Sequence, residues 1–124
     1  MENKPEEKLI NAIIVSADIR MDAYACLYYD LHLKGFGFEA SFGRRKIGFG
    51  YLGADEFIGS AKGMEALMRI MDVVGVEKWS DLNGKYVRVV DPGGWNEVWK
   101  IGNIIDNKWF DQMEFFRELD EEEV

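Results

Sequence analysis

The residues best suited to chemistry lie in one glycine-rich segment, residues 34–53. It contains six glycines, four phenylalanines and one tyrosine, and four cations against one glutamate. At its centre Phe42 and Gly43 are followed directly by Arg44 and Arg45. Arginine forks suit phosphate, glycine lets backbone N–H groups converge on an oxyanion, and an aromatic ring can stack on a base. We therefore predict a site for a small phosphorylated ligand, contacted by these four residues.

The same composition also fits a purely structural role. Dense glycine is typical of bulges and tight turns in an edge hairpin, where aromatic rings cover the glycines and arginines keep the edge in water. The segment is neither a Walker A motif nor a dinucleotide-binding fingerprint, because it lacks Gly-Lys-Ser/Thr and does not lead from a strand straight into a helix. Composition alone leaves both interpretations open.

Four residues outside this segment are further candidate ligand contacts. Trp95 and Asn96 lie at the tip of a loop over residues 91–97, where the ring could stack on a base and the amide bind its edge, or where both could anchor a subunit contact. Arg20 ends the first predicted strand, and Arg117 is isolated among acids near the C-terminus. For each of these two arginines a surface ion pair is the alternative.

The residues needed for familiar catalytic sites are scarce. The chain has one histidine, His32, and one cysteine, Cys26, so a zinc site is not expected. A Ser/His/Asp arrangement would need His32 to meet a serine, and no serine stands in a Gly-x-Ser-x-Gly elbow. We predict that the protein is not an enzyme and uses no metal or cofactor. A single cysteine also excludes an intrachain disulfide, which fits a reducing cytoplasm.

Length, composition and charge set the class of protein. A chain of 124 residues, 48% hydrophobic and 31% charged, fits one globular domain with a polar segment over residues 1–8 and an acidic tail over residues 120–124. The net charge of −8 disfavours binding to a nucleic-acid polymer. No apolar run approaches the roughly 18 residues of a membrane span, and no secretory signal is recognisable. We expect a cytoplasmic protein of a bacterial host.

Alternating apolar residues predict a hairpin from Ile13 to Leu33, turning near residues 21–23. One face of this hairpin should be buried, while the other is rich in tyrosine and suits a second layer or a subunit contact. A further strand is predicted over residues 45–52. The apolar spacing after residue 60 predicts a helix over residues 61–74, whose apolar side should join the core. The core side chains expected from it are Met64, Leu67, Met68 and Met71.

The C-terminal half should supply a second hairpin and a last helix. A short helical turn over residues 79–82 precedes strands over residues 86–90 and 98–105, and Asp111 is a suitable N-cap for a helix ending at Leu119. The expected fold is α+β: an antiparallel sheet of two hairpins plus a glycine-rich strand, one long helix and a short C-terminal helix. The tyrosine-rich face and the exposed loop tryptophan predict a homo-oligomer, a dimer or an assembly of dimers.

Several strings together resemble the first family of Thoeris anti-defence proteins of phages. They lie between about residues 9 and 111. They are Asp18-Ile19, Phe42-Gly43, Val73-Val74-Gly75-Val76, Trp79-Ser80-Asp81-Leu82-Asn83-Gly84-Lys85, Val87-Arg88-Val89, Ile101-Gly102-Asn103-Ile104-Ile105 and Trp109-Phe110. The resemblance implies an oligomeric sponge that sequesters the cyclic ADP-ribose signal of a bacterial TIR enzyme, and some members hold cyclic oligonucleotides.

Two departures from the family's pattern are close to residues that could meet a ligand. Arg44 stands where a second glycine is expected, and Asn103 where a histidine is expected. These changes predict a sponge with an altered nucleotide preference. The alternative is a protein-binding inhibitor, whose acidic end over residues 115–124 would occupy a basic surface of a host defence protein.

Overall fold

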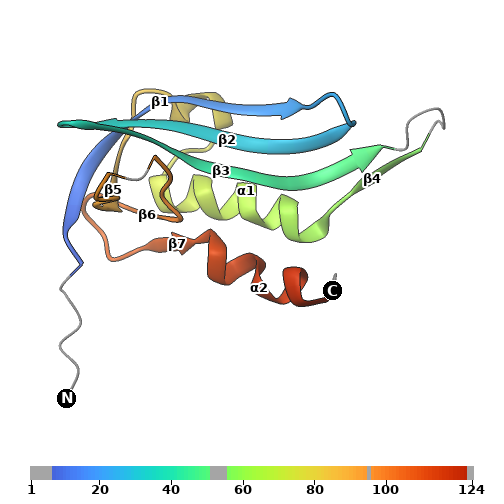
Figure 1. Cartoon of the computed structure of the whole chain (residues 1–124). Helices are drawn as coiled ribbons and strands as arrows, with labels where there is room; N and C mark the ends of the chain where they lie inside the picture. The colour runs from blue at the N-terminus through green and yellow to red at the C-terminus, as the bar shows by residue number, and fades with distance from the viewer. Residues whose placement is uncertain (1–6, 51–55, 95, 123–124) are drawn as a thin grey trace, which may run out of the picture.

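The computed structural model describes residues 7–50, 56–94 and 96–122. Within these residues the chain forms seven β-strands, two α-helices and one 3-10 helix (Figure 1). In chain order they are β1 (Leu9–Met21), β2 (Cys26–Gly35), β3 (Phe38–Gly50), β4 (Phe57–Gly59), α1 (Ala61–Val74), η1 (Trp79–Leu82), β5 (Tyr86–Val90), β6 (Lys100–Gly102), β7 (Trp109–Asp111) and α2 (Gln112–Glu122).

The strands form one antiparallel sheet in the order β4-β3-β2-β1-β5-β6-β7. Neighbours in the sheet are also neighbours along the chain, except that β1 pairs with β5. Both helices lie on one side of the sheet, below the long strands in Figure 1. The predicted α+β class, with one main helix and a short C-terminal helix, is confirmed.

The hairpin of β1 and β2 is formed, but its predicted buried face is confirmed only on β2. Tyr29, Leu31 and Leu33 are fully buried, while the residues between them are half-buried on the opposite face. On β1 the predicted residues Val15, Ile19 and Met21 are exposed, and a register shift between Ile14 and Ser16 leaves Ile14 buried instead. The turn is built by the Asp22 carboxylate, whose Oδ1 accepts from the backbone N–H of Tyr24 at 2.8 Å and of Cys26 at 3.0 Å. A short polar side chain thus fixes the point at which the chain reverses.

Strand β3 is longer than the strand predicted over residues 45–52. It begins at Phe38 and pairs with β2 along its length, with two irregularities of register on the way. At these irregularities the glycine-rich sequence forms bulges. The many glycines therefore bend the strand but do not end it. The last two residues of the predicted strand, 51 and 52, lie outside the described residues.

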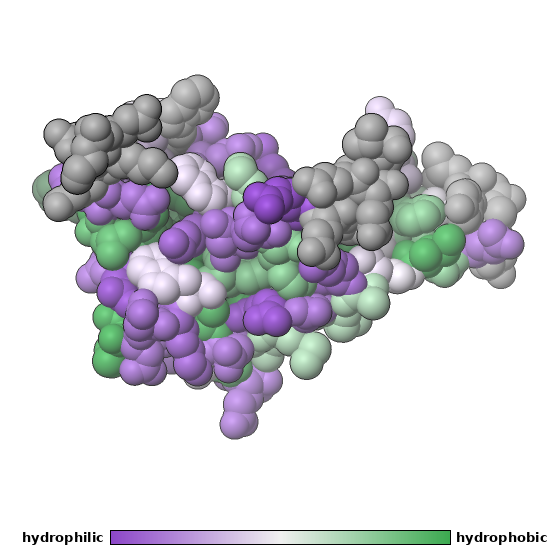
Figure 2. Space-filling view, turned by 90° about the horizontal axis from the view of Figure 1, so that it is seen from below, coloured by the Kyte–Doolittle hydropathy of each residue, from purple (hydrophilic) through white to green (hydrophobic). Residues whose placement is uncertain are grey.

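Helix α1 has the predicted bounds but not the predicted buried side. Its buried residues are Gly63, Ala66, Ile70 and Val73. Of the four residues predicted to join the core, Leu67 is partly buried against it and Met71 is half-buried. Met64 and Met68 are 61% and 65% exposed, so the expectation is wrong for these two methionines. Small residues at positions 63 and 66 let the helix approach the sheet closely, which turns the larger methionines outward. Seen from the helix side, hydrophilic residues lie between the apolar ones (Figure 2).

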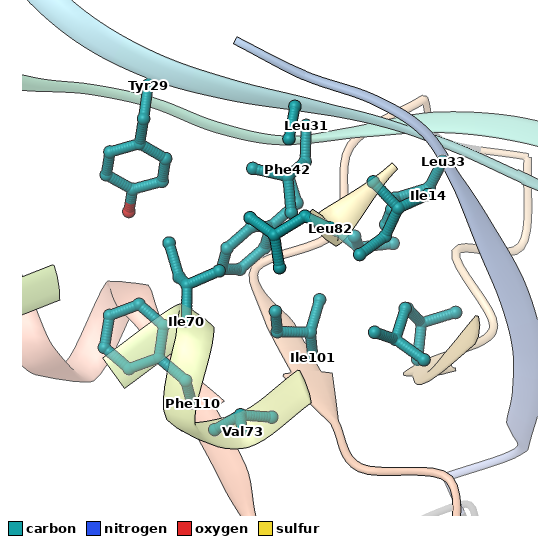
Figure 3. Packing of buried hydrophobic residues seen from close by; sticks show 14 of the residues in the cluster. Ile14, Tyr29, Leu31, Leu33, Phe42, Ile70, Val73, Leu82, Ile101 and Phe110 are labelled. Carbon is teal, nitrogen blue, oxygen red and sulfur yellow. The ribbon is translucent and has the colours of Figure 1, made fainter. Parts of the chain in front are cut away.

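The core lies between the sheet and the two helices (Figure 3). Tyr29 and Leu31 of β2 and Phe42 of β3 point from the sheet towards Ile70 of α1 and Phe110 of β7. The Phe42 and Phe110 rings meet edge to face, with centroids 6.1 Å apart. Burial of these large apolar side chains is the main stabilising contribution to the fold.

The second predicted hairpin is only partly formed. Strand β5 has the predicted bounds, but its partner β6 is three residues long, instead of the strand expected over residues 98–105. Residues 96–98, which precede β6, contact β3 instead of β5. The Ser41 N–H donates to the Asn96 carbonyl at 2.8 Å, and the Val98 N–H donates to the Ser41 carbonyl at 2.9 Å. The chain therefore reaches the free edge of β3 before it joins β5.

The last helix starts as predicted and runs further. The Asp111 carboxylate accepts from the Glu114 N–H at 3.0 Å, which is an N-cap interaction. Helix α2 continues to Glu122, three residues beyond the predicted end. None of the helices in the described part of the chain has the length and apolar character required to cross a membrane.

Candidate functional site

The centre of the glycine-rich segment is a bulge in β3. Gly43 has φ of +130° and Arg44 has φ of +59°, two successive positive values within a strand. A Cβ atom at Gly43 would lie 2.6 Å from the Tyr29 carbonyl oxygen, so β2 approaches too closely for any side chain there. The glycine predicted as a ligand contact is thus first of all a requirement of the backbone. Its effect is to reorient the two arginines that follow.

A cavity of about 320 Å³ opens beside this bulge, and we call it the bulge cavity. This is the size of a small ligand pocket, since such pockets usually measure about 300–1,000 Å³. Its lining combines two guanidinium groups, one carboxylate, one indole and one carboxamide. These groups belong to Arg44, Arg45, Glu97, Trp99 and Gln112, and Gly43 also lines the cavity.

The Arg44 and Glu97 side chains of the bulge cavity are exposed, while Arg45 is half-buried. Arg44 Nη1 lies 3.7 Å from Glu97 Oε1, and both side chains are nearly two-thirds exposed, so water weakens this ion pair. The Arg45 guanidinium lies over the Phe116 ring of α2, 5.3 Å from its centroid. Trp99 is 40% exposed and lines the cavity, and an indole can stack on a planar group.

A buried chain of hydrogen bonds supports the bulge from below. The Tyr29 hydroxyl donates to Gln112 Oε1 at 2.7 Å, and Gln112 Nε2 donates to the Gly43 carbonyl at 3.3 Å. The Gln112 N–H also donates to the Trp99 carbonyl at 2.9 Å. Burial raises the pKa of Tyr29 above its usual range, and the nearby Arg45 charge opposes only part of this effect. The phenol therefore remains a donor.

Sequence reasoning missed Trp99 and Gln112 as site residues. Both come from the C-terminal third of the chain, and only the folded sheet brings them to the bulge. One signal was available for Tyr29: a tyrosine on a buried strand face needs a partner for its hydroxyl. Nothing in the sequence shows that this partner is Gln112, which reads as the first residue of a helix.

The predicted ligand contact by Phe42 is not supported. Its ring is fully buried and packs against Tyr29 and Phe110, so it presents no surface to a ligand. The bulge begins at the next residue, which leaves Phe42 on the core face of β3 while Arg44 reaches solvent.

The remaining predicted residues do not meet at the bulge cavity. Arg20 lies 3.4 Å from Asp30 in a different cavity. Asn96 is exposed and lines a third cavity beside Phe38, and Trp95 lies outside the described residues. Arg117 is exposed on α2, where it pairs with Glu114 at 3.1 Å. Of the predicted contacts, the bulge cavity brings together Gly43, Arg44 and Arg45.

His32 and two of the four serines considered with it lie side by side in the sheet. The register places His32 of β2 beside Ser16 of β1 and Ser41 of β3. Among the described residues, no group of three or more histidine, cysteine, aspartate or glutamate side chains is arranged to hold a metal ion. Comparisons with protein-family models, curated proteins and solved structures found no match to the chain.

Proposed function

We propose that this protein binds and sequesters a small cyclic nucleotide signal in the bulge cavity, without converting it. The observation that carries this proposal is the meeting of Arg44, Arg45 and the Trp99 ring in one cavity of about 320 Å³. Two guanidinium groups suit the adjacent phosphates of a pyrophosphate, and an exposed indole suits a nucleobase. The Glu97 carboxylate can accept from a ribose hydroxyl once the ligand draws Arg44 away from it.

The ligand class follows from the resemblance to the first Thoeris anti-defence family, whose signal is a cyclic ADP-ribose. Such a ligand carries the pyrophosphate, ribose and adenine groups that the cavity lining suits. Cyclic oligonucleotides are a second class consistent with that family. The change to Arg44 beside Gly43 adds a cation to the cavity, which supports an altered preference among these ligands.

A sponge of this kind acts in the cytoplasm of the bacterial host and needs affinity and abundance rather than turnover. Assembly with further copies of the chain belongs to the same proposal. Its support is a group of exposed apolar side chains on the first hairpin, which a subunit contact would cover. They are Val15, Ile19, Met21 and Tyr24.

The proposal is tested by calorimetric titration with cyclic ADP-ribose isomers and cyclic oligonucleotides. We expect at least one to bind, and Arg44→Ala with Arg45→Ala to weaken it by at least about 100-fold, since each lost charge-assisted hydrogen bond is worth about 1.5–3 kcal/mol. Lys62→Ala with Arg69→Ala is the matched control. It removes the same charge from α1, outside the bulge cavity, and should leave the affinity unchanged.

The absence of turnover is tested on the same complex. After incubation the protein is denatured, and the released nucleotide should have its original mass and retention. Recovery of a converted nucleotide would contradict sequestration, and an unchanged affinity of the double arginine variant would remove these arginines from the site.

A further inference from the structure

A second cavity, of about 490 Å³, lies on the sheet face opposite the core, and we call it the open-face cavity. Tyr28 and Asp30 line it from β2, alternating with Tyr29, which points into the core. The helices that cover the Tyr29 side do not reach this face (Figure 1). The cavity is thus separated by the sheet from Gln112 and Trp99 of the bulge cavity.

Cations outnumber carboxylates in the lining of the open-face cavity. Arg20, Arg44 and Lys46 line it together with Asp22 and Asp30. One oxygen of each carboxylate already has a partner within the protein. Asp22 Oδ1 accepts the hydrogen bonds of the hairpin turn, and Asp30 Oδ2 lies 3.4 Å from Arg20 Nη2. The balance of charge favours an anion.

The position of the cations is supported by aromatic rings. The Arg20 guanidinium lies 5.6 Å from the centroid of the Tyr28 ring, and the Lys46 ammonium lies 5.2 Å from that of the Phe49 ring. A ring face attracts a cation without neutralising its charge. Both groups therefore keep hydrogen-bond donors available for a ligand.

One atom of the cavity lining is unusual. Asp30 Oδ1 is buried, and none of the described residues donates a hydrogen bond to it. A buried carboxylate oxygen without a donor is destabilising, and such atoms are rare in folded proteins. Because this oxygen is buried, a ligand can bring a donor to it only by displacing side chains that now cover it. The ligand must then carry negative oxygens for the cations and also a proton for Asp30.

We propose that the open-face cavity binds hydrogen phosphate, with the P–O–H group donating to Asp30 Oδ1 and the remaining oxygens accepting from Arg20, Arg44 and Lys46. Inorganic phosphate keeps at least one such proton at neutral pH. Sulfate keeps none, and a phosphomonoester dianion keeps none. Either of these would place an oxygen lone pair against the lone pairs of Asp30. The carboxylate that attracts hydrogen phosphate therefore also discriminates against the other two anions.

This site does not depend on the proposed nucleotide function. Its cavity shares only Arg44 with the bulge cavity, and the site follows from the cations and from the unsatisfied carboxylate oxygen.

The test is calorimetric titration of the full chain at neutral pH and constant ionic strength with phosphate, sulfate and methyl phosphate. We expect phosphate to bind at least about 10-fold more tightly than either competitor, which is the effect of one charge-assisted hydrogen bond. Asp30→Asn replaces an acceptor by a donor and should reduce the preference for phosphate over sulfate by about 10-fold or more. Lys46→Gln should weaken phosphate and sulfate alike.

Asp18→Asn is the matched control. Asp18 lies directly opposite Asp30 on β1, so this variant removes the same charge from a neighbouring position that does not line the cavity. It should keep the preference for phosphate. Thermal unfolding identifies any variant that fails to fold. In that case the proposal is tested by the preference of the unaltered protein for phosphate over sulfate and methyl phosphate. Four results would each overturn the proposal. They are equal binding of phosphate and sulfate, tighter binding of methyl phosphate than of phosphate, binding of none of the three anions, and equal effects of Asp18→Asn and Asp30→Asn on the preference for phosphate.

Discussion

Gly43 shows how one residue without a side chain shapes the candidate site. Its φ of +130° is a conformation that L side chains rarely adopt, and a Cβ atom would lie 2.6 Å from a backbone oxygen of β2. Neither conflict can be relieved by rotating a side chain, because both involve the backbone. The bulge, and with it the direction of Arg44, therefore depends on glycine at this position.

Gly43→Ala should lower the free energy of unfolding by about 3 kcal/mol or more, from backbone strain together with overpacking. Gly37→Ala is the control, because Gly37 also has positive φ, +80°, but nothing lies within 4 Å of the added Cβ. Its loss should be about 1–2 kcal/mol. Urea unfolding of both variants measures the difference, and equal losses would show that β2 does not constrain Gly43.

The neighbours of Gly43 show how much of the site can be predicted from sequence. Arg44 and Arg45 are adjacent in the chain, and their place in one cavity follows from that adjacency. Phe42 was predicted as a contact because its ring stands beside Gly43 and the arginines. Its ring is buried in the core, which the composition of the segment does not reveal. Trp99 and Gln112 could not be predicted, since only the tertiary fold brings them near the bulge.

The packing of α1 on β3 depends on a close approach at Gly63. A Cβ atom there would lie 2.5 Å from Ile47 Cβ and 2.7 Å from Ile47 Cα. The methionine stripe and the buried residues of α1 both have helical spacing, so periodicity alone cannot say which of them faces the sheet. The sequence pattern predicts the length of the helix, while the contact at Gly63 determines its buried side.

Gly63→Ala is expected to destabilise the protein, although alanine is favoured over glycine in a helix by about 1 kcal/mol. The added methyl group must displace the helix from Ile47, and such overpacking typically costs about 1–3 kcal/mol. Met68→Ala, on the exposed side of α1, should change the free energy of unfolding by no more than about 0.5 kcal/mol. Thermal and urea unfolding test both changes, and a more stable Gly63→Ala protein would mean that α1 is free to shift.

In the molecule as a whole, the first hairpin and the bounds of α1 were predictable, but the short β6 and the contact of residues 96–98 with β3 were not. Local alternation predicts β2 and β5, and apolar spacing predicts the bounds of α1. Neither pattern predicts which residues of β1 and α1 are buried. The crossing of residues 96–98 to the edge of β3 depends on hydrogen bonds to Ser41, between segments more than 50 positions apart. That crossing brings Glu97 to Arg44 and thus forms one wall of the bulge cavity.

Arg44 connects the two cavities, because it lines both the bulge cavity and the open-face cavity. One guanidinium cannot serve a nucleotide on one side of the bulge and a phosphate ion on the other side with the same donors. If both proposed sites are occupied, each ligand must therefore weaken the other, and by thermodynamic reciprocity the two factors are equal. Phosphate should raise the nucleotide dissociation constant by about fivefold or more at constant ionic strength.

Arg44→Gln should abolish this antagonism, because the guanidinium shared by the two cavities is gone. The antagonism is measured as the ratio of two nucleotide affinities of the same variant, so weaker binding of either ligand does not change the comparison. Arg69→Gln, on α1 and outside both cavities, should retain it. The measurement is a nucleotide titration at several phosphate concentrations, with chloride replacing phosphate in the reference. Phosphate and the nucleotide are first shown to bind separately. If phosphate then leaves the nucleotide affinity unchanged, Arg44 contacts the ligand of only one cavity, and the ligand of the second cavity binds without Arg44.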